Sequence, residues 1–354
     1  MNDNRHVLVS IIVACRNEIK QVRRFLDSLQ SQDMAGISWE AVLADGMSDD
    51  GTREVLEEYS ARYAHIRVIA NSGRIVSTGL NAAIRAARGE YIIRMDAHTC
   101  YARDYCRKCV ETLERTGADN VGGPARTRAQ GVQARAVAAA YHSPFSTGGA
   151  RFHDPNYEGF VDTVPYGCWR KATLERLGLF DENLVRNQDD ELNLRMLLAG
   201  GKIWQDPTIM SWYSPRATVS GVFKQYMQYG FWKVAVLRKH RTVASWRHLV
   251  PGTFVFANIL LLVAVTLGAL LGAWVVAPFA ALWLAILAVY GLASVVASLT
   301  AAQGAGWATL PYLPLVFATY HLSYGLGFLA GLIRFAFKPT GPLRTESAFS
   351  RITR

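Results

Sequence analysis

The sequence predicts a doubly wound α/β domain followed by a C-terminal part built from membrane-spanning helices. Short β-branched runs alternate with amphipathic stretches over most of the first 220 residues, a pattern typical of βαβ units around a parallel sheet. Residues 253–300 contain no charged side chain, which is long enough for two spans of about 20 residues each.

The expected elements alternate regularly over the first hundred residues. Residues 7–14 form a near-continuous β-branched run, typical of a strand buried on both faces. Further strands are expected at 39–44, 66–70 and 91–95. Helices are expected at 19–32, 53–64 and 77–87, the last closed by Gly89 as its C-cap.

Beyond residue 100 the pattern is weaker but continues. The expected elements are helices at 104–116, 134–140 and 171–177, strands near 121–124 and 202–205, and a helix that begins near residue 187. Residues 143–156 are rich in Gly, Ser and Pro and are expected to form a mobile loop near the functional site.

The charge is distributed unevenly along the chain. Residues 1–223 contain 27 Lys or Arg and 27 Asp or Glu, whereas residues 224–354 contain 11 basic residues and one acid. Because the basic part is also the most apolar part, it indicates a membrane with anionic lipid and not a nucleic acid. Residues 1–6 are polar and the following apolar run is short, so no signal peptide is predicted and the N-terminal region is expected in the cytosol.

The five cysteines are an odd number and suit a reducing compartment. Cys106 and Cys109 have a spacing found in zinc sites, but no second pair lies nearby. On a helix they are three residues apart, so packed thiols are the favoured interpretation.

Three successive predicted strands each end in a polar loop, and the fourth, at 91–95, leads directly to an aspartate and a histidine. Because the carboxyl ends of parallel strands meet at one edge of a sheet, these loops are expected to collect at one site. Simple turn and helix-cap roles would also explain several of these residues, but their recurrence at one edge favours a nucleotide site. The side chains concerned are Glu18, Asp45, Arg74, Asp96 and His98.

A second acidic cluster opens the helix near residue 187. Asp189, Asp190 and Glu191 could stabilise the helix dipole without any chemical role. A carboxylate in this position could equally act as a general base. The residues alone leave both interpretations open.

Four segments together resemble the inverting, nucleotide-sugar-dependent glycosyltransferases of family 2, and the resemblance covers about residues 7–235. They read VSIIVACRNE (9–18), ADGMSDDGT (44–52), SGRIVSTGLNAAIRAARGEYIIRMDAHT (72–99) and NQDDELNLRMLLAGGKI (187–203). The resemblance implies a GT-A fold, which is a Rossmann-like, doubly wound mixed sheet. Within the family the chain is most similar to membrane-associated glucosyltransferases of succinoglycan-type exopolysaccharide assembly.

The resemblance implies a donor site for a UDP-sugar. Asp45 would face the uracil, and Glu18 would line the nucleoside pocket, while Gly46 stands where the family has a second aspartate. Asp96 and His98 would hold a divalent metal, Mn²⁺ or Mg²⁺, with histidine favouring the softer ion. The expected nucleotide-sugar-binding residues are Ala14, Arg16, Glu18, Asp45, Ser48, Gly73, Arg74, Asn81 and Asp96.

The same resemblance implies an acceptor side. Alignment on Leu192 and Arg195 makes Asp189 the catalytic base and puts Gln188 where the family has glutamate. The expected acceptor-side residues are Tyr166, Gly167, Cys168, Trp169, Gln188, Asp190 and Arg195.

Residues 219–241 mix aromatic, apolar and basic side chains and predict an interfacial helix. Phe223, Tyr226, Phe231 and Trp232 are expected to enter lipid. The segment lacks the Q-x-x-R-W motif of processive family members, which indicates transfer of a single sugar. The expected membrane-interface residues are Lys224, Gln225, Tyr229, Trp232 and Lys233.

Membrane spans are expected at 253–275, 278–299 and 310–333. Three spans would move the basic tail across the membrane, against the positive-inside rule. Two spans with a re-entrant segment, or four short spans, would avoid this. Length favours three.

The resulting domain prediction is a GT-A domain at 1–218, interfacial helices at 219–248, spans at 249–335 and a basic tail at 336–354. The expected function is the transfer of one hexose, with inversion, from a UDP-sugar to a polyprenyl-diphosphate-linked saccharide. Glucose is the expected hexose. The alternatives are a polyprenyl-monophosphate sugar transferase and a non-catalytic nucleotide-binding scaffold. Membrane lipids and other polysaccharide-assembly enzymes are expected partners, and the expected location is the inner (plasma) membrane, multi-pass, with a cytoplasmic catalytic domain.

Overall fold

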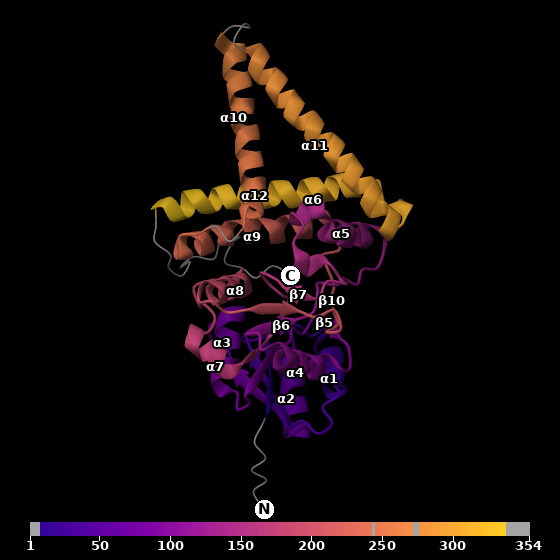
Figure 1. Cartoon of the computed structure of the whole chain (residues 1–354), viewed down its shortest axis with the longest axis vertical. Helices are drawn as coiled ribbons and strands as arrows, with labels where there is room; N and C mark the ends of the chain where they lie inside the picture. The colour runs from indigo at the N-terminus through magenta and orange to yellow at the C-terminus, as the bar shows by residue number, and fades with distance from the viewer. Residues whose placement is uncertain (1–7, 243–244, 272–275, 338–354) are drawn as a thin grey trace, which may run out of the picture. The chain divides into compact units, whose positions relative to one another are not determined.

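The computed structural model describes residues 8–242, 245–271 and 276–337 (Figure 1). The chain divides into two compact units, each described below by itself. The first contains Met1–Arg128 and Arg151–Ser214, and the second contains Ala129–Ala150 and Pro215–Arg354. Residues 129–150, which the sequence assigns to the catalytic domain, therefore group with the C-terminal part.

The first unit is built on an eight-stranded mixed sheet with strand order β3-β2-β1-β4-β8-β6-β9-β7. The strands β3, β2, β1 and β4 run parallel to one another. The strand β8 is antiparallel to both of its neighbours, β4 and β6. On the far side, β6 and β9 are parallel and β7 is antiparallel to β9. The strands are β1 Val9–Cys15, β2 Trp39–Asp45, β3 Ile66–Ala70, β4 Tyr91–Arg94, β6 Asn120–Gly122, β7 Gly159–Phe160, β8 Cys168–Arg170 and β9 Ile203–Gln205. A separate antiparallel pair joins β5 Thr99–Tyr101 to β10 Ser211–Tyr213.

Helices cover both faces of this sheet. Successive side chains of a strand point to opposite faces, so Ile11 and Ile93 join one core and Ile12 and Ile92 the other. The first core includes residues of α1 Val22–Gln30, α2 Thr52–Arg62 and α4 Tyr105–Thr116, and the second includes residues of α3 Val76–Ala86, α7 Lys171–Leu177 and α8 Gln188–Leu198. The doubly wound mixed sheet predicted from the sequence is confirmed.

Two local predictions in this region are wrong. Gly89 does not cap α3, which ends at Ala86 with Ala87 extended. Instead, a Cβ atom at Gly89 would lie 2.5 Å from the backbone nitrogen of Ser10, so glycine permits close approach to β1. Residues 143–156 are not one loop, because they contain the helix α6 Pro144–Thr147 and the 3-10 helix η1 Arg151–His153.

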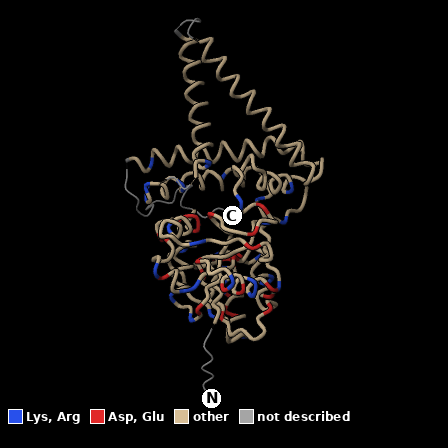
Figure 2. The backbone as a smooth tube through the Cα atoms, in the orientation of Figure 1, with Lys and Arg blue, Asp and Glu red and all other residues tan. Residues whose placement is uncertain are grey.

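The second unit is helical. Besides α6 it contains α5 Val132–His142, α9 Val219–His240, α10 Val250–Leu271, α11 Val276–Ala305 and α12 Leu313–Phe337, with the short 3-10 helices η2 Trp246–His248 and η3 Trp307–Thr309. Within the described part of the chain, three helical segments are long and apolar enough to cross a membrane, Trp246–Leu270, Val276–Ala305 and Leu313–Ala336. Figure 2 shows that α10 and α11 carry no charged residue. The basic tail predicted at 336–354 lies almost wholly outside the described residues.

A helix is present where the sequence predicts an interfacial one, as α9, but its aromatic residues do not all face outward. Phe231 and Trp232 are 3% and 2% exposed and lie near Phe335 of α12, so the expectation that they enter lipid is wrong. Lys233 is also buried, whereas Lys224 is exposed and Tyr229 half-buried. Gln225 is buried and donates a hydrogen bond to Tyr229 Oη at 2.9 Å.

Candidate active site

The site lies in the first unit, where β2, β1 and β4 end side by side. These strands are parallel neighbours, so the loops that follow Cys15, Asp45 and Arg94 emerge at the same edge. His98 Nδ1 lies 3.7 Å from Glu18 Oε1, which joins the first loop to the third. The collection of polar side chains predicted for this edge is therefore present.

Asp45 is held in place at the end of β2. It is 1% exposed, and its Oδ1 accepts a hydrogen bond from Ser48 Oγ at 2.6 Å. Ser48 Oγ in turn accepts a hydrogen bond from the backbone nitrogen of Asn17, a residue with a positive φ of 56°. A Cβ atom at Gly46 would lie 2.9 Å from Arg16 Cβ, so a larger residue there would collide with Arg16. This contact gives a physical reason for glycine where the family has aspartate.

The acids that follow Asp45 hold the two loops together. Asp49 Oδ1 accepts a hydrogen bond from Asn17 Nδ2 at 2.8 Å, and Asp50 Oδ2 accepts one from the backbone nitrogen of Ile19. Burial alone would raise the pKa of Asp50, but hydrogen bonds from Thr52 and Ile19 outweigh it and lower that pKa. These two acids act as turn and cap residues.

Arg94 forms the centre of the site. Its side chain is 6% exposed, and its Nε and Nη2 donate to Asp96 Oδ1 and Oδ2, each at 3.1 Å. Its Nη1 lies 3.7 Å from Asp189 Oδ2 and makes no hydrogen bond among the described residues. One guanidinium thus faces two predicted site carboxylates. Burial would raise the pKa of Asp96, but the charges of Arg94 and His98 outweigh it and lower that pKa.

Sequence reasoning missed Arg94. The signal was present, because a charged residue interrupts the otherwise apolar run of β4, two positions before an acid. Unpaired arginine is rarely buried in a strand, so its position predicts an ionic partner within the fold.

Asp96 and His98 offer a carboxylate and an imidazole to a metal ion. Both Asp96 oxygens already accept from Arg94, but each retains lone pairs for a cation. Among the described residues no group of three or more His, Cys, Asp or Glu side chains is suited to hold a metal. Asp96 and His98 could therefore supply two protein ligands to a divalent ion.

Asp189 lies in the first turn of α8, which follows Asn187 at a positive φ of 60°. Its side chain is 45% exposed, and Oδ1 accepts a hydrogen bond from the backbone nitrogen of Asp190. Gln188 is buried, and its Oε1 has no hydrogen-bond partner among the described residues. An exposed carboxylate beside Arg94 can be reached by an incoming hydroxyl group.

Arg195 is held by protein groups. It pairs with fully buried Glu191 at 2.7 Å and donates to the backbone oxygens of Leu177 and Leu179. These contacts close the turn between α7 and α8 and are sufficient to account for the residue structurally.

The predicted acceptor segment is divided in two. Tyr166 Oη lies 2.7 Å from Thr99 Oγ1, and the Gly167 oxygen accepts a hydrogen bond from the Arg94 backbone nitrogen. Cys168 and Trp169 are 0% and 2% exposed within β8, so the expectation that they contact an acceptor is wrong. They are core residues because β8 is inserted between β4 and β6.

Asn81 is also structural. It is 2% exposed, its Nδ2 donates to the Phe180 oxygen and to Glu182, and its Oδ1 accepts from the Phe180 nitrogen. With its amide used in this way, its predicted nucleotide-binding role is wrong. Arg74, by contrast, is exposed after β3 with a positive φ of 60°.

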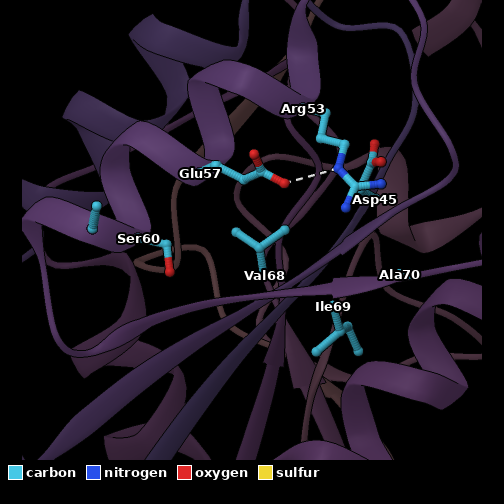
Figure 3. A pocket seen from close by; sticks show the side chains of 8 residues that line it. Asp45, Arg53, Glu57, Ser60, Val68, Ile69 and Ala70 are labelled. Atoms are coloured by element: carbon cyan, nitrogen blue, oxygen red, sulfur yellow. Dashed lines mark hydrogen bonds and ion pairs between the residues drawn. The ribbon is translucent and has the colours of Figure 1, made fainter.

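A cavity of about 380 Å³ adjoins Asp45 (Figure 3). Figure 3 shows Arg53 of α2 beside Asp45, and Arg53 Nε donates to Glu57 Oε1 at 2.8 Å. The floor is formed by residues of β3, so the cavity lies between β3 and α2. Neither Arg53 nor Glu57 was predicted. The lining residues are Asp45, Arg53, Glu57, Ser60, Ala61, Val68, Ile69 and Ala70.

The sheet and the acids at its carboxyl edge define the class of protein, a transferase of the GT-A type. The sequence profile described as Glycosyl transferase family 2 matches residues 10–173, and the chain belongs to this family.

Two relatives support this assignment, and one solved structure shares the fold. The chain is 29% identical to the succinoglycan biosynthesis protein ExoA of Rhizobium meliloti, over 92% of this chain and 95% of that protein. It is 30% identical to a dolichyl N-acetyl-alpha-D-glucosaminyl phosphate 3-beta-D-2,3-diacetamido-2,3-dideoxy-beta-D-glucuronosyltransferase of Methanococcus voltae, over 70% and 79%. The mannosyltransferase PcManGT of Pyrobaculum calidifontis, solved with GDP-Man and Mn²⁺, matches with a TM-score of 0.57 at 20% identity, over 92% and 88% of the two chains, and shows the shared fold.

Proposed function

We propose that this protein is a membrane-anchored, inverting glycosyltransferase that moves one hexose from a UDP-sugar to a polyprenyl-diphosphate-linked saccharide. Glucose is the first candidate for the sugar, and synthesis of an exopolysaccharide or another cell-surface polysaccharide is the process. The catalytic unit would face the cytosol at the inner membrane. The observation that carries the proposal is the arrangement of Asp96 and Asp189 around one buried guanidinium.

The names of the relatives support a lipid-linked saccharide as the acceptor. The name of the Rhizobium protein refers to succinoglycan biosynthesis, and the name of the Methanococcus protein describes a sugar phosphate carried on dolichol. Three apolar helices, long enough to cross a membrane, would keep the enzyme near such a lipid. Other enzymes of the same assembly process are proposed as partners.

The chemistry is a single in-line displacement. The acceptor oxygen attacks the anomeric carbon and its proton passes to the Asp189 carboxylate. The bond from the anomeric carbon to the diphosphate oxygen breaks, and its electron pair leaves with UDP. Arg94 contributes a fixed positive charge between the donor and acceptor sides.

Asp96 and His98 would hold a divalent cation, Mn²⁺ or Mg²⁺. When bound, the ion supplies positive charge that balances the diphosphate of the leaving UDP. Asp45, Ser48 and the cavity beside them are proposed to receive the nucleoside.

The test uses membranes that contain the protein, Mn²⁺ and a panel of radiolabelled UDP-sugars, with added lipid-linked saccharide. Label from one sugar should enter the organic-extractable fraction, and Asp189→Asn should lower the rate of this transfer by about 10²–10⁴-fold. Glu175→Gln is the matched control, because it removes an exposed carboxylate on α7 and should leave the rate unchanged. Full activity of Asp189→Asn would show that the base is wrongly assigned.

Two other functions give different results in this assay. A polyprenyl-monophosphate sugar transferase would yield a lipid product with one phosphate and one sugar, which mass spectrometry distinguishes from an elongated saccharide. A non-catalytic scaffold would bind UDP and transfer no label to any acceptor.

A further inference from the structure

The three candidate spans differ in how the protein surrounds them. Each candidate span contains an apolar stretch of 18 residues. Only 11% of this stretch is buried within the protein in the span of α10 and 6% in that of α11, whereas 50% is buried in that of α12. Among the exposed apolar residues, Leu270 is 78% and Val289 69% exposed. Two long uncharged helices with so much apolar surface require lipid around them.

α12 is less apolar and carries polar groups inside. The mean hydropathy of its candidate span is 1.4, whereas the candidate spans of α10 and α11 each have a mean hydropathy of 2.3. Thr319, His321 and Ser323 are each less than 10% exposed, so one side of α12 faces other protein elements. This helix therefore does not resemble the other two candidates.

The partner of α12 along most of its length is α9. A Cβ atom at Gly327 would lie 1.9 Å from the Met227 oxygen, and one at Gly331 would lie 2.7 Å from the Phe231 oxygen. The two backbones touch because glycine leaves no side chain between them. Contacts advance in the same direction along both helices, from Tyr226 with Tyr320 to Phe231 with Phe335, so α9 and α12 run parallel.

α9 is too highly charged to lie in a bilayer core. It contains Lys224, Lys233, Arg238 and Lys239 within 22 residues. Charged side chains are costly in the hydrocarbon layer, whereas a basic and aromatic helix suits the headgroup region. Because α12 packs against α9 along most of its length, both helices must occupy the same layer.

Among the described residues of α12, four of the five exposed large apolar side chains lie along one stripe, and Leu332, 46% exposed, lies to one side of it. The residues of the stripe are Leu315, Leu322, Leu326 and Ile333, which are 57%, 42%, 41% and 66% exposed. At about 100° per residue these four positions fall within about 20° of one line, and Gly327 and Gly331 lie on the opposite side. A helix held by α9 on one side and apolar on the other fits the surface of a lipid layer.

We propose that only α10 and α11 cross the membrane, as a two-span hairpin, and that α9 and α12 lie together in the plane of the interface. Figure 1 shows α12 lying across the base of α10 and α11. A Cβ atom at Gly325 would lie 2.4 Å from the Pro251 oxygen, so the start of α10 crosses α12 near its middle. The inference rests on the membrane association proposed above.

Two spans return the chain to the side of the membrane from which α10 departs. The basic residues Lys338, Arg344, Arg351 and Arg354 then stay on the same side as the basic residues of α9. This agrees with the positive-inside rule, which three spans would violate.

The test is cysteine accessibility in the full-length chain, expressed in intact bacterial cells and treated with a membrane-impermeant maleimide. Arg354→Cys should react only after the cells are permeabilised. Ala273→Cys, between α10 and α11, should react in intact cells. Reaction of Arg354→Cys in intact cells would overturn the two-span arrangement.

The same experiment separates this inference from the proposed membrane association. Recovery of the protein in the carbonate-washed membrane fraction tests the association alone. A protein absent from that fraction would contradict both proposals, whereas a membrane protein with an externally labelled Arg354→Cys contradicts only the topology. Gly304→Cys, at the end of α11, is the matched control and should stay protected from the maleimide in intact cells.

Discussion

Arg94 Nη1 lies 3.7 Å from Asp189 Oδ2, although 95 positions in the sequence separate the two residues. The rest of the same guanidinium binds both oxygens of Asp96. The proposed metal ligand and the proposed base therefore share one rigid cation. Under the proposed function, this arrangement would couple the donor side of the site to the acceptor side.

We expect Asp189→Asn to lower the transfer rate by about 10²–10⁴-fold, the usual contribution of a general base. The amide has nearly the same shape, so binding of UDP should be retained. Steady-state rates measured with saturating donor, together with UDP binding by calorimetry, check both parts. Loss of UDP binding would indicate that Asp189 supports the donor site instead.

We expect Arg94→Met to damage the site more broadly. Asp96 would lose its paired charge in a mostly buried place, at a cost of about 1–3 kcal/mol in the free energy of unfolding. Donor affinity should fall as well. Thermal unfolding and the KM for UDP-sugar measure the two effects.

Two variants serve as controls for that experiment. Arg94→Lys keeps the charge but cannot reproduce the two-pronged contact with Asp96, so its fold should survive while its KM rises. Arg23→Met removes an exposed partner of Glu58 and should change neither quantity appreciably. Wild-type KM in Arg94→Met would contradict a role for Arg94 at the donor site.

We expect removal of divalent cations with EDTA to stop transfer and Mn²⁺ to restore it. His98→Asp would replace the imidazole by a carboxylate and should shift the preference from Mn²⁺ towards Mg²⁺. Metal titrations of the rate, with wild type and variant side by side, measure the shift. An unchanged metal preference would exclude His98 as a ligand.

We expect acid to weaken the fold through Asp206. This buried carboxylate accepts hydrogen bonds from Thr112 and Thr208 and pairs with Arg115 at 2.6 Å. Burial would raise the pKa of Asp206, but these bonds and the Arg115 charge outweigh it and lower that pKa below the ordinary value of 3.8. The stabilisation is therefore complete above the ordinary value and is lost as the pH falls through the lowered pKa.

The measurement is the unfolding temperature of wild type and Asp206→Asn as a function of pH. At neutral pH the variant should be less stable by about 1–3 kcal/mol, and the difference should shrink below the ordinary aspartate pKa. Glu158→Gln removes the exposed partner of Arg115 and should have little effect at any pH. A difference that stays constant down to strongly acidic pH would contradict this account.

The sequence by itself determined the parallel strands β1 to β4, the helices between them and the loops that meet at the edge of the sheet. Buried runs such as β1 carry their secondary structure in local periodicity, and parallel connections then fix where their ends must lie. For that reason Glu18, Asp45, Asp96 and His98 could be expected at one site. The family motifs added the assignment of Asp189.

Only the tertiary structure decided which residues near those motifs are structural. Cys168 and Trp169 follow the aromatic and small-residue segment 163–167, but insertion of β8 between two strands buries both. Asn81 and Arg195 look like ligand-binding residues, yet their polar atoms are used by backbone groups distant in sequence. No local pattern reveals which partner a side chain will find, because the partner is brought close only by folding.

The same reason applies to α12. Its length and composition predict a third span, although it is less apolar than α10 and α11, and its packing against α9 is what assigns it to a different place. Local sequence encodes a preference for helix and for an apolar environment. Whether lipid or another helix supplies that environment depends on long-range contacts, which the sequence specifies only through the complete fold.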